Sequence, residues 1–238
     1  MRTFFYLVFL HLLLAFSLSL AAQDSSSTAS KPAPAQRNTA AAKEAEAQGQ
    51  ELLFQKHDTK GAIESFKKCV KLDPWYGHGY LMLGLAYMQM QRWDEAQWAF
   101  EDASKVEPEN PQAWLGVGSA LNEQKDYAGA QKALQRCLEL KPDSAEAHYE
   151  LGRSLWSLGK LEAAEEQTKR AIELNKEYAS PHVLMGNIYL SGSDADSALA
   201  EFREALKLDP EGPQASSIKQ TISEIEKAKT GSGKAKKP

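Results

Sequence analysis

Few residues in this chain have the types and spacing that catalysis or metal binding requires. Two of its five histidines, His148 and His182, could form a two-histidine metal site. A zinc site needs three or four ligands, and no cysteine or carboxylate is assured beside this pair. The sequence contains no Gly-rich phosphate loop, nucleophile elbow or closely spaced Cys or His pair. We therefore expect no enzymatic activity, no bound metal and no cofactor, with a metal-dependent enzyme as an alternative.

The composition is typical of a globular protein with a hydrophobic core. Of the 238 residues, 42% are hydrophobic, and the two cysteines are too few for a disulfide framework. The 28 Lys+Arg stand against 32 Asp+Glu, a formal net charge of −4. This balance disfavours a nucleic-acid partner, because phosphate backbones are bound by basic surfaces.

Residues 1–21 have the layout of a secretory signal peptide. Arg2 precedes an apolar run over residues 4–20, and the segment ends in Ser19-Leu20-Ala21 with small residues at alternate positions. We expect cleavage after Ala21 and export to the periplasm or secretion, from a bacterium. The alternative is that residues 4–20 remain as a membrane anchor, since this length is at the lower limit for a bilayer span. We expect membrane contact only in that case.

Both ends of the mature chain are expected to be disordered. Residues 22–42 consist largely of Ala, Ser, Thr and Pro, without a large apolar side chain that could offset the entropy of ordering. Residues 230–238 form a short basic tail with lysines at 234, 236 and 237. We interpret the first segment as a flexible linker and the second as a solubilising end.

The central part of the chain repeats with a fixed period. Glycine recurs at positions 84, 118, 152 and 186, alanine at 62, 96, 130, 164 and 198, and proline at 74, 108, 142 and 210. The period predicts five units of two antiparallel helices each, in which places 1 to 34 are counted from the first residue. The units are residues 43–76, 77–110, 111–144, 145–178 and 179–212. Residues 213–229, with Ile218, Ile222 and Ile225 on one face, predict a helix that caps the open end.

This pattern resembles the tetratricopeptide repeat, and the resemblance covers residues 43–212. The second unit carries the whole signature: Tyr80, Leu83, Gly84, Tyr87, Ala96, Phe100, Ala103 and Pro108. The first unit departs from the signature, because Glu46 and Gln50 stand where the aromatic residue and the glycine are expected. The fourth unit has Thr168 in place of the large apolar residue and Lys176 in place of the proline. The resemblance implies an all-α, right-handed superhelical solenoid that binds peptides or protein surfaces. The missing proline leaves open where the second helix of the fourth unit ends.

The repeat register also gives the histidines and cysteines structural roles. His148 and His182 occupy place 4, where an aromatic side chain usually packs between helices, so packing is favoured over metal binding. Cys69 and Cys137 occupy place 27, where the other units have alanine. Two units apart they should lie on the order of 20 Å from each other, too far for a disulfide. We expect two buried thiols.

In arrays of this type the first helix of each unit lines a concave groove. Helical geometry turns places 2, 5, 9, 12 and 13 into it. The family's clamp for a C-terminal carboxylate needs Lys or Arg and Asn at places 5 and 9, but the second unit has Leu81 and Leu85 there. The clamp is therefore missing. Only Arg153 and Asn187 could hold a carboxylate or a peptide backbone. The predicted peptide-binding residues are Leu81, Leu85, Met88, Asn122, Tyr149, Arg153, Trp156 and Asn187.

These observations predict a non-enzymatic scaffold or adaptor of the cell envelope that binds a protein or peptide segment in its groove. The alternative is a periplasmic chaperone or assembly factor that holds apolar segments of client proteins. The groove could instead be covered by the C-terminal helix or the N-terminal linker, or be buried by tight superhelical curvature.

Overall fold

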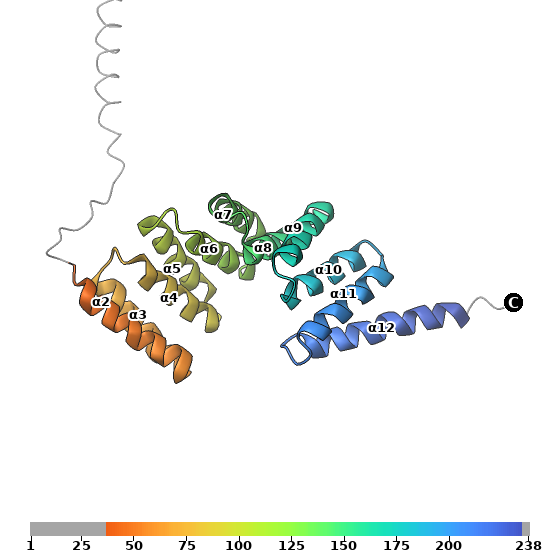
Figure 1. Ribbon diagram of the computed structural model, residues 1–238, viewed down its shortest axis with the longest axis horizontal. Coiled ribbons are helices and arrows are strands. Elements are labelled where there is room, and N and C mark those ends of the chain that lie inside the picture. Colours follow the sequence, from red (N-terminus) through yellow and green to blue (C-terminus); the bar gives the residue numbers. More distant parts are fainter. Residues whose placement is uncertain (1–36, 235–238) are drawn as a thin grey trace, which may run out of the picture. The chain divides into compact units, whose positions relative to one another are not determined.

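A computed structural model describes residues 37–234 of the chain. These residues form an all-α solenoid of five helix pairs followed by one further helix, which is the predicted fold class (Figure 1). The predicted signal peptide, residues 1–21, and most of the predicted linker lie outside the described residues. Within residues 37–234 no helix is long and apolar enough to cross a membrane.

Each pair consists of a first helix and a second helix that pack side by side and then contact the next pair. The first helices are α2 (Thr39–Gln50) with the π-helical turn η2 (Glu51–Gln55), α4 (Gly77–Gln89), α6 (Pro111–Glu123), α8 (Ala145–Ser157) and α10 (Ala179–Ser191). The second helices are α3 (Thr59–Leu72), α5 (Trp93–Val106), α7 (Tyr127–Leu140), α9 (Leu161–Leu174) and α11 (Ala195–Leu208). The last helix is α12 (Ala215–Lys234).

A glycine on each first helix lies against one side chain of its second helix. A Cβ atom added at Gly84 would stand 2.6 Å from the Phe100 ring, and one added at Gly118 would stand 2.5 Å from Leu134 Cγ. These distances are shorter than any ordinary carbon contact, so only glycine allows the two helices to approach this closely. The recurrence of glycine once in every repeat is therefore a packing requirement.

The first pair meets the same requirement with a shifted register. Gly49, one residue before the position that the repeat predicts, lies against the Phe66 ring. The sequence separation between Gly49 and Phe66 is therefore one residue longer than that between Gly84 and Phe100. The π-helical turn Glu51–Gln55 accommodates this additional residue, as π-bulges do. The assignment of Gln50 to the glycine place was therefore wrong.

The first helix also begins earlier than expected. The linker was predicted to reach residue 42, but α2 starts at Thr39. The Asn38 side chain caps it by accepting a hydrogen bond from the Ala41 N–H, and the Asn38 N–H donates to the Leu72 carbonyl at 3.0 Å. These contacts order a segment that has no large apolar side chain.

The second helix of the fourth pair ends in register without a proline. Helix α9 stops at Leu174, the same place at which its counterparts stop, and Asn175 follows in an extended conformation. The Asn175 side chain accepts a hydrogen bond from the Glu177 N–H at 3.1 Å, which forms the turn that proline supports elsewhere. Thr168 is fully buried and bonds to the Ala164 carbonyl at 2.7 Å.

Helix α12 covers the end of the last pair, as predicted. Ile218 is buried and Ile222 and Ile225 are half-buried against a cluster that contains Phe202. The helix continues to Lys234, so the tail predicted to be disordered from residue 230 is helical over residues 230–234. Ion pairs such as Arg203–Glu226 at 2.7 Å join α12 to α11.

The turn within every pair needs one residue with positive φ, and only the fourth pair supplies glycine. The residues are His57, Gln91, Lys125, Gly159 and Ser193, with φ between 54° and 72°. A Cβ atom added at Gly159 would meet no other atom within 4 Å. An alanine there would be strained only through its backbone.

We therefore expect Gly159→Ala and Gly118→Ala to destabilise the array for different reasons and by different amounts. Gly159→Ala should lower the free energy of unfolding by about 1 kcal/mol, through the left-handed backbone alone. Gly118→Ala should lower it by about 2 kcal/mol or more, because its Cβ overlaps Leu134. Urea denaturation of both variants measures this, and equal losses would contradict the assignment of Gly118 to a close helix crossing.

Candidate binding groove

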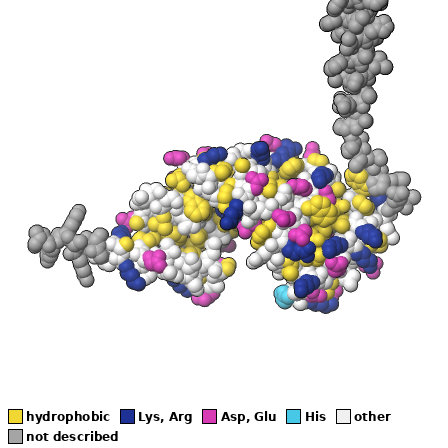
Figure 2. All heavy atoms as spheres, turned by 180° about the vertical axis from the view of Figure 1, so that it is seen from behind, with side chains coloured by type: hydrophobic (Ala, Val, Ile, Leu, Met, Phe, Trp, Pro, Cys, Tyr) yellow, Lys and Arg dark blue, Asp and Glu magenta, His cyan; other side chains and the backbone are white. Residues whose placement is uncertain are grey.

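Two hollows lie along the first helices and divide the eight predicted groove residues between them. Leu81, Leu85 and Met88 line the first hollow, between α4 and α6. Asn122, Tyr149, Arg153, Trp156 and Asn187 line the second, among α6, α8 and α10. The face of the array in Figure 2 shows apolar side chains in separate patches among charges of both signs, and a hollow that opens at one edge.

The first, which we call the apolar hollow, has a volume of ≈ 340 Å³. Its floor includes Phe100, whose ring is inserted between α4 and α6 because Gly84 and Gly116 leave room for it. Leu85 lines it and is 49% exposed, so an apolar side chain of this hollow is open to solvent. The full lining is Leu81, Leu85, Met88, Phe100, Gln112, Leu115, Gly116 and Ser119. No residue of α12 contributes to it.

The second, the polar hollow, has a volume of ≈ 250 Å³ and a mostly polar lining. Tyr149 packs edge-on against Tyr178 with ring centroids 5.3 Å apart, and Trp156 donates a hydrogen bond from Nε1 to Ser191 Oγ at 3.0 Å. Burial raises the pKa of the Tyr149 hydroxyl, so this group stays protonated.

The sequence interpretation missed three residues of the polar hollow: Tyr127, Leu184 and Gln214. Leu184 is at place 6 of its repeat, outside the places that were assigned to the groove. Tyr127 is the first residue of a second helix, and helical periodicity alone does not turn that position toward the groove. Gln214 precedes α12, outside the repeats. The C-terminal segment thus reaches the polar hollow through Gln214 but contributes nothing to the apolar hollow. The expectation that this segment could cover the groove therefore holds for the polar hollow only.

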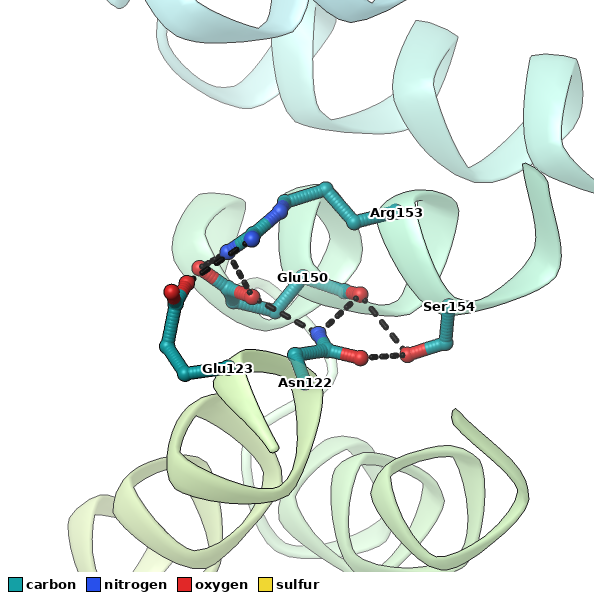
Figure 3. A network of polar contacts seen from close by, with 5 residues as sticks. All are labelled: Asn122, Glu123, Glu150, Arg153 and Ser154. Carbon is teal, nitrogen blue, oxygen red and sulfur yellow. Dashed lines mark hydrogen bonds and ion pairs between the residues drawn. The ribbon is translucent and has the colours of Figure 1, made fainter. Parts of the chain in front are cut away.

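A network of polar contacts joins α6 to α8, and two of its residues, Asn122 and Arg153, line the polar hollow (Figure 3). Arg153 donates to Glu123 of the preceding repeat at 2.8 Å and to Glu150 of its own helix at 2.9 Å. Asn122 is buried, and its amide nitrogen donates to the Glu150 carboxylate at 2.8 Å while its amide oxygen accepts from Ser154 Oγ at 2.7 Å. These contacts join one repeat to the next.

The charges of this network disfavour a carboxylate ligand. Partial burial lowers the pKa of the Arg153 guanidinium, but the adjacent carboxylates of Glu150 and Glu123 raise the pKa by more, so the group remains charged. Two carboxylates against one guanidinium leave a net charge of −1. Arg153, the residue predicted to hold a carboxylate, is instead engaged by two carboxylates of its own chain.

Each of the two histidines considered as metal ligands bonds through Nδ1 to the second helix of its own pair. His148 Nδ1 lies 2.8 Å from Gln167 Oε1, and His182 Nδ1 lies 2.7 Å from Glu201 Oε2. The Nε2 atom of His148 also lies 3.0 Å from the carbonyl oxygen of Pro142, in the turn before α8. Residues 37–234 contain no group of three or more His, Cys, Asp or Glu side chains placed to hold a metal ion.

Both cysteines are free and buried, as predicted. Burial, with smaller contributions from Glu46 and Asp73, raises the pKa of the Cys69 thiol to about 12. Burial also raises the pKa of Cys137, to about 11. The thiolate is the reactive form, so neither residue has the features of a nucleophile.

The buried thiols give a test of the helix packing around them. We expect neither Cys69 nor Cys137 to react with a thiol-specific reagent at pH 8 in the folded protein, and both to react in denaturant. The raised pKa values keep the thiolate fraction small below about pH 10, and burial blocks access. Rapid modification of either cysteine in the native protein would contradict this placement.

The network predicts that Asn122 and Asn187, both on first helices, differ in their effect on stability. Asn122→Leu should lower the free energy of unfolding by about 2 kcal/mol, because it removes a buried amide from a bonded network. Asn187 is half-buried, and its side-chain amide bonds to no other residue in the described part of the chain. Asn187→Leu, the control, should change stability by less than about 0.5 kcal/mol. Thermal or urea denaturation compares them, and equal effects would count against the network.

Comparison with known sequences matches most of the array to one family. Tetratricopeptide repeat models match residues 81–136, residues 121–188, and residues 49–74 together with 179–211. A comparison with curated proteins finds none that matches.

Solved structures with the same fold include three that this chain matches over most of their length. A crystal structure of MamA is 27% identical with a TM-score of 0.59, over 68% of this chain and 94% of MamA. TTC0263, a thermophilic repeat protein of Thermus thermophilus, is 17% identical with a TM-score of 0.64, over 78% of this chain and 98% of that one. YrrB, described as a repeat protein with an unusual peptide-binding site, is 23% identical with a TM-score of 0.56, over 74% of this chain and 90% of that one.

The family models, the helix pairs and the glycine crossings agree with one another. Together they show that this chain belongs to the tetratricopeptide repeat family, whose arrays typically serve as protein–protein interaction scaffolds.

Proposed function

We propose that this protein is a non-enzymatic scaffold that binds an apolar peptide or protein segment in the groove formed by its first helices. The apolar hollow carries this proposal. It exposes Leu85 beside Met88 and Leu115, and no other element of the described chain covers it. Side chains of this kind release water when a partner buries them, and such anchors provide most of the energy of an interface.

The polar hollow extends the same surface toward the C-terminal repeats. Tyr149, Trp156 and Asn187 supply a phenol hydroxyl, an indole ring and a free amide along it. A segment that fills the apolar hollow would find hydrogen-bonding groups for its backbone here, as peptide ligands in grooves require. YrrB, which shares the fold, has a peptide-binding site, in keeping with this use of the array.

We also propose that the scaffold works in the cell envelope, in the periplasm or after secretion. The proposal rests on the sequence of residues 1–21, with one basic residue, a long apolar run and a small-residue exit. The sequence between residue 22 and the first helix would separate the array from an anchor if the apolar segment is retained.

Capture of partners tests the proposed function. The chain from residue 22 on contains every described helix, so it carries the whole groove. We expect it to retain one protein or a small set of proteins from a native extract. The double variant Leu85→Glu/Trp156→Ala should lose this partner, because the introduced carboxylate would have to be buried without a partner in the apolar hollow when the ligand binds. Mass spectrometry identifies the retained proteins.

Leu158→Glu is the matched control. Leu158 is also an exposed leucine, 38% accessible, but it lies in the turn after α8 and lines neither hollow. It should retain the partner. A partner held equally by the double variant would contradict the groove, and retention of many unrelated unfolded proteins would favour the chaperone alternative.

A further inference from the structure

Helix α6 presents an apolar and an acidic side chain to the same groove. Leu115, Ser119 and Glu123 follow at every fourth position, which places them along one face of the helix. Leu115 and Ser119 line the apolar hollow. Glu123 follows at the C-terminal end of the helix, about 12 Å beyond Leu115 at a rise of about 1.5 Å per residue.

Of the two carboxylates in the network, Glu123 is the one that remains available. Glu150 is 14% exposed and accepts hydrogen bonds from both Arg153 and Asn122. Glu123 is 33% exposed and bonds to Arg153 through Oε1 at 2.8 Å. Within residues 37–234 no donor bonds to its Oε2, so this oxygen can accept from a ligand.

Glu123 also lines a third hollow, which we call the end hollow, of ≈ 690 Å³ between the turn after α4 and the start of α12. A second carboxylate, Asp209, lines it as well, together with apolar residues such as Val183 and Ile218. No Lys, Arg or His stands in this lining. The groove thus continues from an apolar hollow to a negatively charged one.

We propose that the segment bound in the groove is basic as well as apolar, with one bulky apolar side chain in the apolar hollow and a Lys or Arg that pairs with Glu123. This rests on the proposed function of the groove. The separation of about 12 Å between Leu115 and Glu123 corresponds to about four residues of an extended peptide at roughly 3.3 Å per residue. The ligand therefore carries its basic residue about four positions from its apolar anchor.

The net negative charge of the Glu123, Glu150 and Arg153 group supplies the selectivity. A cationic side chain would neutralise it, whereas an acidic side chain would meet unbalanced carboxylates. Glu123 stands at the edge of the network, so a ligand reaches it without disturbing the buried Asn122.

Selection from a library of random dodecapeptides displayed on phage tests this proposal. The chain from residue 22 on is the target, and peptides that also bind the Leu85→Glu variant are removed. We expect the remaining peptides to combine a bulky apolar residue with Lys or Arg three to five positions away. Acidic peptides should be depleted.

A synthetic peptide from the selection then measures the pair directly by fluorescence anisotropy. Glu123→Gln should weaken binding about threefold to tenfold, and Glu123→Lys should weaken it further. Replacing the basic residue of the peptide by methionine should weaken binding as much as Glu123→Gln does. Combining the two changes should cause no additional loss of affinity, because each change removes the same ion pair. Glu139→Gln, which removes the same charge from the outer helix α7, should leave affinity unchanged.

The outcomes separate this proposal from the one on which it rests. Selected peptides without a basic preference, or unaffected by Glu123→Gln, would overturn the charge pairing and leave the apolar groove intact. If no peptide distinguishes the protein from its Leu85→Glu variant, the groove is not a binding site, and both proposals are wrong.

Discussion

The contact between a glycine on one helix and a large side chain on the next determines the rest of this structure. In the first, second and fifth pairs the large side chain is Phe66, Phe100 or Phe202, and its ring occupies the space that a Cβ atom would take. Because this contact sets how closely the helices approach, it also sets how each pair meets its neighbour. Phe100 illustrates this, since its ring touches Gly84 in its own repeat and Gly116 in the next. A stack of such contacts gives a continuous core to a chain whose helix pairs are each too small to have one.

The sequence was sufficient for the fold because this requirement recurs at a fixed period. It was less informative where the period is interrupted. The shift to Gly49 in the first pair depends on a single additional residue that a π-helical turn absorbs, and only the spacing from Gly49 to Phe66 indicated it. The start of α2 depends on Asn38 and its bond to Leu72, a contact between distant parts of the chain that no local pattern reveals.

The candidate groove was predicted in part, for a related reason. All eight residues predicted from helical periodicity line the two hollows. Periodicity succeeds here because the helical backbone determines toward which side each side chain projects. Periodicity does not say which charges will pair. Glu150 lies at place 6, outside the set considered, yet it engages Arg153 and Asn122 and thereby changes what the polar half of the groove can accept. Helix packing does not restrict which residue types occupy the groove-facing places. One repeat can therefore carry leucines there while another carries a charged network.

The two buried thiols have a consequence for how this protein folds. Cys69 and Cys137 lie in separate helix pairs, on α3 and α7, and each fills a place where alanine serves elsewhere in the array. Neither contributes a covalent crosslink, so stability comes from helix packing alone. Folding of the array therefore needs no thiol-oxidising enzyme, and no disulfide links its stability to the redox potential of its surroundings.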